Sequence, residues 1–205
     1  LHIINPGIKP KEEREVTHQL KRVADEASKK YNMIIIYQLI KGSIFTDIAD
    51  FVNSKEANLV VMGTHGMKGM QKITGSWALK VIVKSKVPFI VVQDPPADQE
   101  RYHNIVFPVD FRIENKEKMG MAIFMGKYFD SKIHILKSVS KDVSLKRRIN
   151  INLNFAIKYL IQNNIEYEIH KIPRGNLAQK TIDFAQEINA DLILIMTTKH
   201  ISMAD

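Results

Sequence analysis

Residues 57–63 read Ala57-Asn-Leu-Val-Val-Met-Gly63, an apolar run that ends in a glycine and opens directly into Thr64-His65-Gly66. A second glycine comes directly before a hydroxyl residue at Gly75-Ser76, where a helical pattern begins. A strand, a glycine turn and a helix N-terminus together suit an anion, because glycines let the backbone approach a phosphate and the helix offers free N–H groups. The stretch therefore predicts a strand-turn-helix unit with a phosphate-binding loop.

The chain repeats itself with an offset of 133 residues, measured from Gly42 to Gly175. In each copy a glycine is followed by a helical pattern and then by an aliphatic run, Leu59-Val-Val-Met62 in one and Leu192-Ile-Leu-Ile195 in the other. Apolar runs without alternation are typical of central strands in a parallel sheet that is covered on both faces. The paired identical residues are Asp50 and Asp183, Phe51 and Phe184, Ala57 and Ala190, Leu59 and Leu192, and Thr64 and Thr197.

Apolar periodicity predicts two sets of alternating strands and helices. The first set has strands at 1–5, 33–40, 58–63 and 89–93 and helices at 11–30, 43–56 and 76–85. The second has strands at 104–109, 132–138, 165–171 and 191–196 and helices at 115–129, 143–162 and 176–188. This alternation indicates βαβ units, parallel sheets and right-handed crossovers.

The repeat also predicts the domain limits: a first domain over 1–93, a linker over 94–102 and a second domain over 103–205. By the offset, the counterpart of the strand at 104–109 would lie about 30 residues ahead of Leu1. Counterparts of residues 67–93 would begin at residue 200 and run past Asp205. We therefore expect the first domain to lack its first strand and helix, and the second its last helix and strand.

Composition narrows the classes of function. The chain of 205 residues has no cysteine, which excludes disulfides and thiolate chemistry and fits a cytoplasmic location. Its apolar runs are far shorter than the roughly 20 residues that cross a bilayer, so no membrane segment is expected. The net charge of +8 comes mostly from scattered lysines, and the densest basic cluster, Lys141 to Arg148, has no interleaved aromatics. We expect no nucleic-acid partner.

The glycine pattern resembles the nucleotide-binding members of the universal stress protein family. Their motif is Gly, two residues, Gly, nine residues, then Gly with Ser or Thr, and Gly63, Gly66, Gly75 and Ser76 fall on it with eight residues in the longer gap. The closing run Val87-Pro-Phe-Ile-Val-Val92 and the opening run Ile105-Val-Phe-Pro-Val-Asp110 also resemble that family. The resemblance implies tandem doubly wound parallel-sheet domains with strand order 3-2-1-4-5.

The resemblance implies ATP as cofactor and a nucleotide site in the first domain. Its candidate residues are Met62, Gly63, Gly66, Gly75, Ser76 and Trp77. In the second copy Met196 and Lys199 stand at the positions of the first two glycines, so that copy lacks the loop. Ser76 also suits a helix cap, and the two roles are compatible.

Other polar residues favour structural roles. Asp110 sits where open α/β sheets place ligands, and the family's opening strand ends in an aspartate that touches the nucleotide. We favour a structural role for Asp110, as a turn residue that caps the next helix. No sequence spacing joins His134 or His170 to other ligands, so we expect no metal site. His65 has no partnered carboxylate in its segment, and we expect no catalytic residue and no enzymatic activity.

Two functions remain open from the sequence. One is a cytoplasmic stress-response sensor or regulator that binds ATP. The other is a nucleotide-free module for dimerisation or protein interaction, which some members of the family form through their last strand. The apolar run Val87–Val92 would then be a sheet edge that pairs with a second copy of the chain.

Overall fold

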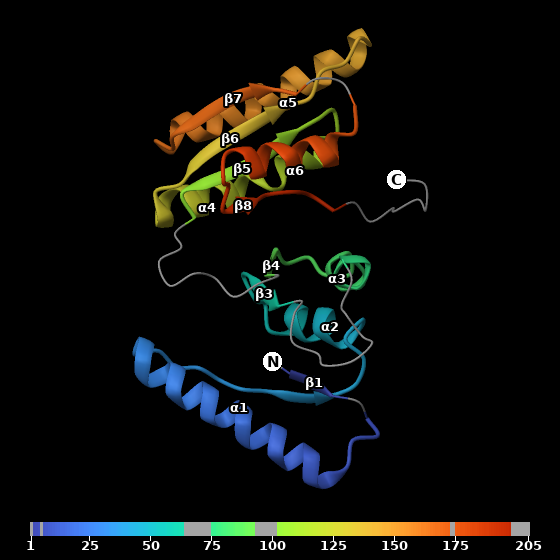
Figure 1. Ribbon diagram of the computed structural model, residues 1–205, viewed down its shortest axis with the longest axis vertical. Helices are drawn as coiled ribbons and strands as arrows, with labels where there is room; N and C mark the ends of the chain where they lie inside the picture. Colours follow the sequence, from blue (N-terminus) through green and yellow to red (C-terminus); the bar gives the residue numbers. More distant parts are fainter. Residues whose placement is uncertain (1, 5, 64–74, 93–101, 173–174, 198–205) are drawn as a thin grey trace. The chain divides into compact units, whose positions relative to one another are not determined.

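The computed structural model describes residues 2–4, 6–63, 75–92, 102–172 and 175–197 (Figure 1). The chain divides into two compact units, Leu1–Asp94 and Pro95–Asp205. Most of the predicted linker, 94–102, lies outside the described residues. Both units are α/β with parallel strands, as the sequence predicts.

The second unit is built on a four-stranded parallel sheet in the order β7-β6-β5-β8. Its strands are β5 (Asn104–Val109), β6 (Lys132–Lys137), β7 (Tyr167–Lys171) and β8 (Leu192–Ile193). Counted within the unit, this order is 3-2-1-4. It therefore reproduces the first four positions of the predicted order 3-2-1-4-5.

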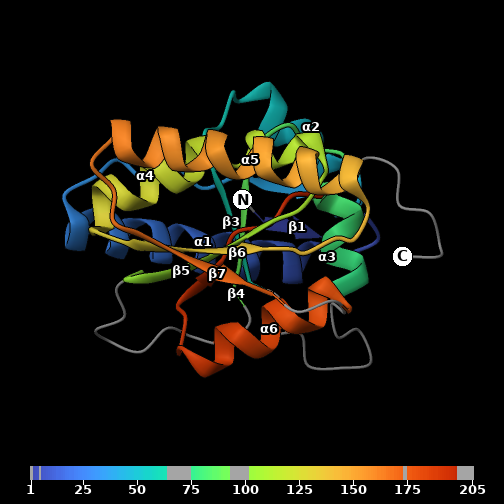
Figure 2. The same cartoon turned by 90° about the horizontal axis from the view of Figure 1, so that it is seen from above.

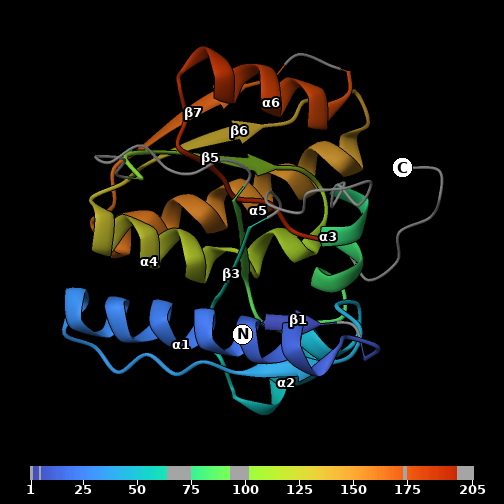
Figure 3. The same cartoon turned by 60° about the horizontal axis from the view of Figure 1, so that its bottom comes forward.

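Helices cover both faces of this sheet. Helices α4 (Met119–Phe129) and α5 (Val143–Gln162) lie on one face, and α6 (Leu177–Glu187) lies on the other (Figures 2 and 3). The central strand β5 is buried from Ile105 to Val109, which explains its uninterrupted apolar sequence. Its alternate residues feed two separate cores, with Ile105 and Phe107 facing α4 and α5 and Val106 facing α6.

Side-chain caps fix where two of these helices begin. The carboxylate of Asp142 accepts a 2.8 Å hydrogen bond from the Leu145 amide at the start of α5. The amide oxygen of Asn176 accepts from Ala178 N at 3.0 Å and from Gln179 N at 3.2 Å at the start of α6. Both residue types are favoured at this position because they satisfy amides that have no partner within the helix.

The first unit contains two separate pairs of parallel strands. Strand β1 (His2–Ile4) pairs with β2 (Leu39–Lys41), and β3 (Val60–Gly63) pairs with β4 (Phe89–Val92). No strand joins the two pairs within the described residues, whereas in the second unit β5 joins β6 to β8. The helices are α1 (Pro10–Tyr31), α2 (Asp47–Ser54) and α3 (Gly75–Ile82), and α2 contacts α3.

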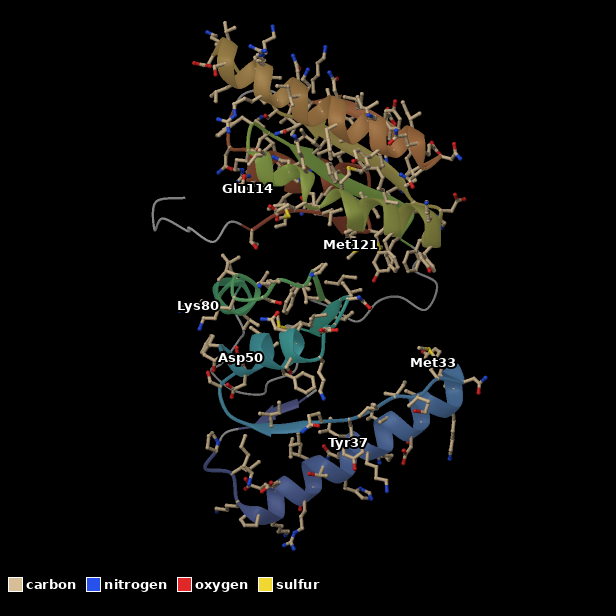
Figure 4. The ribbon with its side chains drawn as sticks, turned by 180° about the vertical axis from the view of Figure 1, so that it is seen from behind. Met33, Tyr37, Asp50, Lys80, Glu114 and Met121 are labelled. Atoms are coloured by element: carbon tan, nitrogen blue, oxygen red, sulfur yellow. The ribbon has the colours of Figure 1, made fainter. Side chains whose placement is uncertain are left out.

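The strand predicted over 33–40 is only partly formed. Strand β2 covers Leu39–Lys41, and the preceding segment runs alongside α1 without a strand partner among the described residues (Figure 4, Met33 and Tyr37). Ile34 and Ile36 on this segment are 93% and 82% exposed. The sequence supplies the right residue types, but a strand needs a neighbour to bond with, and only residues opposite His2–Ile4 have one.

Two predicted elements of the second unit also differ from the structure. The helix predicted over 115–129 is divided into the 3-10 turn η1 (Ile113–Lys116) and α4, with Lys118 buried at the junction. The strand predicted over 191–196 is reduced to β8, because β5 pairs with it only at Leu192 and Ile193. The apolar pattern correctly predicts a helix in the first region and a strand in the second. It does not predict the break before α4 or the short length of β8.

Candidate functional site

The predicted nucleotide site lies where β3 ends and α3 begins. Met62 and Gly63 are the last residues of β3, with Met62 half-buried and Gly63 exposed. Gly75, Ser76 and Trp77 form the first turn of α3. Gly66 lies outside the described residues, with the rest of segment 64–74.

Gly63 occupies open space at the carboxyl end of its strand. A Cβ added there would meet no atom of the described residues within 4 Å, and its φ is outside the left-handed region. Neither packing nor backbone conformation among the described residues therefore requires glycine here. A side chain at this position would instead occupy the space that a bound ligand needs, since ligands of open α/β sheets bind beyond the carboxyl ends of strands.

The start of α3 has the electrostatic character of an anion site. Its first turn contains no acidic residue, and Lys80 lies in its last turn. The first amides of a helix have no partner within it, and the helix dipole places partial positive charge there. The end of β3 and the start of α3 are thus the two described parts of the predicted site.

In the second unit, Asp110 comes directly after β5 and its carboxylate is bound by its own chain. Oδ1 accepts from the Arg112 backbone amide at 2.9 Å and from the Asn115 side-chain amide, while Oδ2 accepts from Arg112 Nε at 2.7 Å. Asp110 is only 6% exposed. The bond from residue i+2 forms an Asx turn that leads into η1, which is the turn role that the sequence favours.

Two further side chains, those of Asn152 and Lys118, donate hydrogen bonds to the backbone on either side of Asp110. Asn152 on α5 donates to the carbonyls of Asp110 and Arg112, both at 2.8 Å. Lys118 donates to the Pro108 carbonyl, and its Nζ lies 4.3 Å from the centre of the Phe107 ring. Burial lowers the pKa of Lys118 to about 7, although the nearby Asp110 carboxylate opposes part of that shift.

We expect the second unit to become more stable as pH rises above 7 because of Lys118. The unfolded chain binds a proton at this lysine up to its ordinary pKa, and the folded chain releases it near pH 7. The free energy of unfolding should then rise by up to about 1.4 kcal/mol per pH unit in this window. Urea unfolding at pH 7 and pH 9 measures it.

Two variants separate this effect from other titrations. Lys118→Met should remove most of the pH-dependent gain relative to the unmodified chain. Lys127→Met replaces an exposed lysine of α4 and should leave the gain unchanged. Equal pH dependence in all three proteins would contradict the assignment to Lys118.

Sequence reasoning missed the partners of Asp110 and the pairing of two histidines. Arg112 and Asn115 lie two and five residues beyond Asp110, spacings that suit a turn, but Asn152 is 42 residues away on another helix. His134 and His170 lie on neighbouring strands, with Nδ1 of the first 3.2 Å from Nε2 of the second. Only the register between β6 and β7 could have revealed this pair.

Comparison with known proteins identifies the first unit. Residues 5–93 match the family model of the universal stress protein family. The first unit belongs to the universal stress protein family. In agreement, the chain is 33% identical over 85 residues to a universal stress protein from Methanocaldococcus jannaschii. That match covers 41% of this chain and 48% of the relative, so it spans about half of the relative's length.

Solved structures of universal stress proteins share the fold over both units. A universal stress protein from Archaeoglobus fulgidus matches with a TM-score of 0.66 at 20% identity, over 91% of this chain and 68% of that one. A putative universal stress protein from Pseudomonas aeruginosa matches with a TM-score of 0.64 at 15% identity, over 100% of this chain and 74% of that one. At such identities the likeness shows the fold alone.

The description of this family connects its members with the stress response. None of the helices in the part of the chain that the structure describes has the length and apolarity needed to cross a membrane.

Proposed function

We propose that this universal stress protein binds ATP or a similar nucleotide in its first unit and acts as a sensor or regulator rather than as an enzyme. The observation that carries the proposal is the open position of Gly63 at the carboxyl end of β3, together with the start of α3 at the last glycine of the sequence motif. Phosphate oxygens would accept from backbone amides there, and Trp77 would lie near the base. A cytoplasmic location follows from this role.

The proposal assigns no nucleotide to the second unit. Its Asp110 carboxylate is already bound by Arg112 and Asn115, and Met196 and Lys199 replace the first two loop glycines. A nucleotide would have to displace these internal bonds before it could use Asp110. We therefore assign one nucleotide per chain, in the first unit.

Gly63→Ala is the variant that tests the site most cleanly. The added methyl group meets no atom within 4 Å in the part of the chain that the structure describes, so the free energy of unfolding should stay unchanged or nearly so. The methyl group should nevertheless keep a phosphate from the backbone and weaken ATP binding about tenfold or more, which is at least about 1.4 kcal/mol. Isothermal titration with ATP and Mg²⁺ measures both proteins.

Gly120→Ala supplies the matched control. This glycine lies in α4 of the second unit, and a Cβ there also meets no atom within 4 Å. Its ATP affinity should equal that of the unmodified chain. No heat at millimolar ATP with the unmodified chain would end the nucleotide proposal.

A second candidate function is assembly through β4. Phe89, Ile90 and Val91 of this strand pair with β3, no second strand borders these three residues within the described part of the chain, and Val91 is 43% exposed. Strand edges of this kind recruit further strands. A homodimer joined edge to edge along Phe89–Val91 would follow, and sedimentation at high concentration tests it. A strictly monomeric chain would count against this candidate.

A further inference from the structure

A cluster of three side chains on the sheet of the second unit has the composition of a metal site. His134 on β6 and Glu168 and His170 on β7 place their ligand atoms within 4.8 Å of one another. Within the residues that the structure describes, no other group of three histidine or acidic side chains comes as close. The cluster lies in the second unit and is independent of the nucleotide proposal.

Strand register creates the cluster. His134 is the direct register partner of Glu168, and Leu136 is the partner of His170. Because side chains alternate along a strand, Glu168 and His170 point to the same face of the sheet. That face is the one covered by α6, whose Phe184 ring lies 4.6 Å from the His170 ring, centre to centre.

The distances fit a tetrahedral ion held by two imidazoles. His134 Nδ1 and His170 Nε2 are 3.2 Å apart. Two nitrogens bound at about 2.0–2.1 Å in tetrahedral geometry would be about 3.3 Å apart. Glu168 Oε1 lies 3.9 Å from His170 Nε2, and its side chain is half-exposed, so a small rotation brings it into range.

Neighbouring side chains orient two of the candidate ligands, His134 and Glu168. Asn104 Oδ1 lies 3.0 Å from His134 Nε2 and accepts a hydrogen bond from its N–H group, which leaves the lone pair on Nδ1. Lys132 Nζ lies 3.0 Å from the other carboxylate oxygen of Glu168, so Oε1 faces the histidines. Such outer contacts orient metal ligands in known sites.

We propose that His134, Glu168 and His170 bind a Zn²⁺ ion, with water as the fourth ligand. Imidazole and carboxylate ligands without a thiolate suit zinc and its neighbours in the first transition row. His134 is buried, whereas Glu168 is open to solvent, so an ion can enter from the edge of the sheet. When the ion binds, the Nε2 proton of His170 moves to Nδ1 of the same ring, which ends the hydrogen bond to His134 and leaves the Nε2 lone pair for the ion.

Titration of the whole chain with Zn²⁺ in the absence of nucleotide tests the site. We expect one ion per chain by calorimetry, and with Co²⁺ as probe the strong visible absorption of a tetrahedral complex. His170→Ala should weaken binding at least about tenfold, and Asn104→Ala, which removes only the outer contact, by about 10- to 100-fold. Circular dichroism should show both variants folded.

His103→Ala is the matched control, because it removes an exposed imidazole outside the cluster. Its zinc affinity and cobalt spectrum should equal those of the unmodified chain. The proposal is overturned if the unmodified chain takes up no zinc, if cobalt stays octahedral, or if His170→Ala and His103→Ala bind the ion equally well.

Discussion

Phe107→Ala should lower the free energy of unfolding of the second unit by about 3–5 kcal/mol. Phe107 sits in the central strand β5, is 1% exposed and packs in the core formed with α4 and α5. Replacing the ring by a methyl group removes buried apolar area and leaves a cavity. It also removes the aromatic ring that lies against Nζ of Lys118. Urea unfolding followed by far-ultraviolet circular dichroism measures the loss.

Phe124→Ala is the matched control for this change. Phe124 lies on α4 of the same unit but is 41% exposed, and its ring contacts Tyr128 on the same helix. We expect a loss of roughly 1 kcal/mol or less, since little buried surface is removed. Equal losses in the two variants would show that β5 is not the centre of this core.

Gly126→Val should destabilise the second unit by about 1–3 kcal/mol. A Cβ at Gly126 would lie 2.7–2.9 Å from three side-chain carbons of Ile165, closer than real contacts allow. Ile165 is only 6% exposed, so it has little room to move away. The glycine therefore lets α4 approach the segment that leads into β7.

Two comparisons test this explanation of Gly126. Gly120 lies on the same helix, at a position where a Cβ meets no atom of the described residues within 4 Å. Gly120→Val should therefore change the free energy of unfolding little or not at all. The double variant Gly126→Val/Ile165→Ala should lose less free energy of unfolding than the two single variants lose together, because the clash disappears. Additive costs would mean that the two residues do not compete for space.

Much of the fold of the second unit follows from the sequence because its strands β5 and β6 are buried along most of their length. The run at 104–109 is largely apolar, and both it and the segment at 132–138 form strands with almost the predicted limits. The limits of α5 are predicted correctly at 143 and 162. Helix α5 has a clear start signal in Asp142, whose side chain caps it.

Strand pairing is where the sequence is insufficient. Residues 33–38 have strong strand residues yet pair with nothing among the described residues, because pairing is a property of two segments and not of one. The same holds for the histidines at 134 and 170. Their positions in predicted strands are visible in the sequence, but the register that brings them together is not.

The candidate nucleotide site is predictable in part for a similar reason. Gly63 and Gly75–Trp77 are recognised by local spacing, and they lie at a strand end and a helix start. The bonds around Asp110 depend on Asn152, which a distant helix supplies, and no local pattern encodes it. Local sequence patterns therefore predict which strands and helices border a ligand site. Whether a polar side chain there is already hydrogen-bonded within the protein depends on tertiary contacts.

Amide chemical shifts recorded while ATP and Mg²⁺ are added to the whole chain test the central claim most directly. We expect the amides of Gly63, Gly75, Ser76 and Trp77 to move progressively, while those around Asp110 in the second unit stay in place. Amides at these four positions that do not respond up to millimolar ATP, or shifts confined to the second unit, would contradict the account.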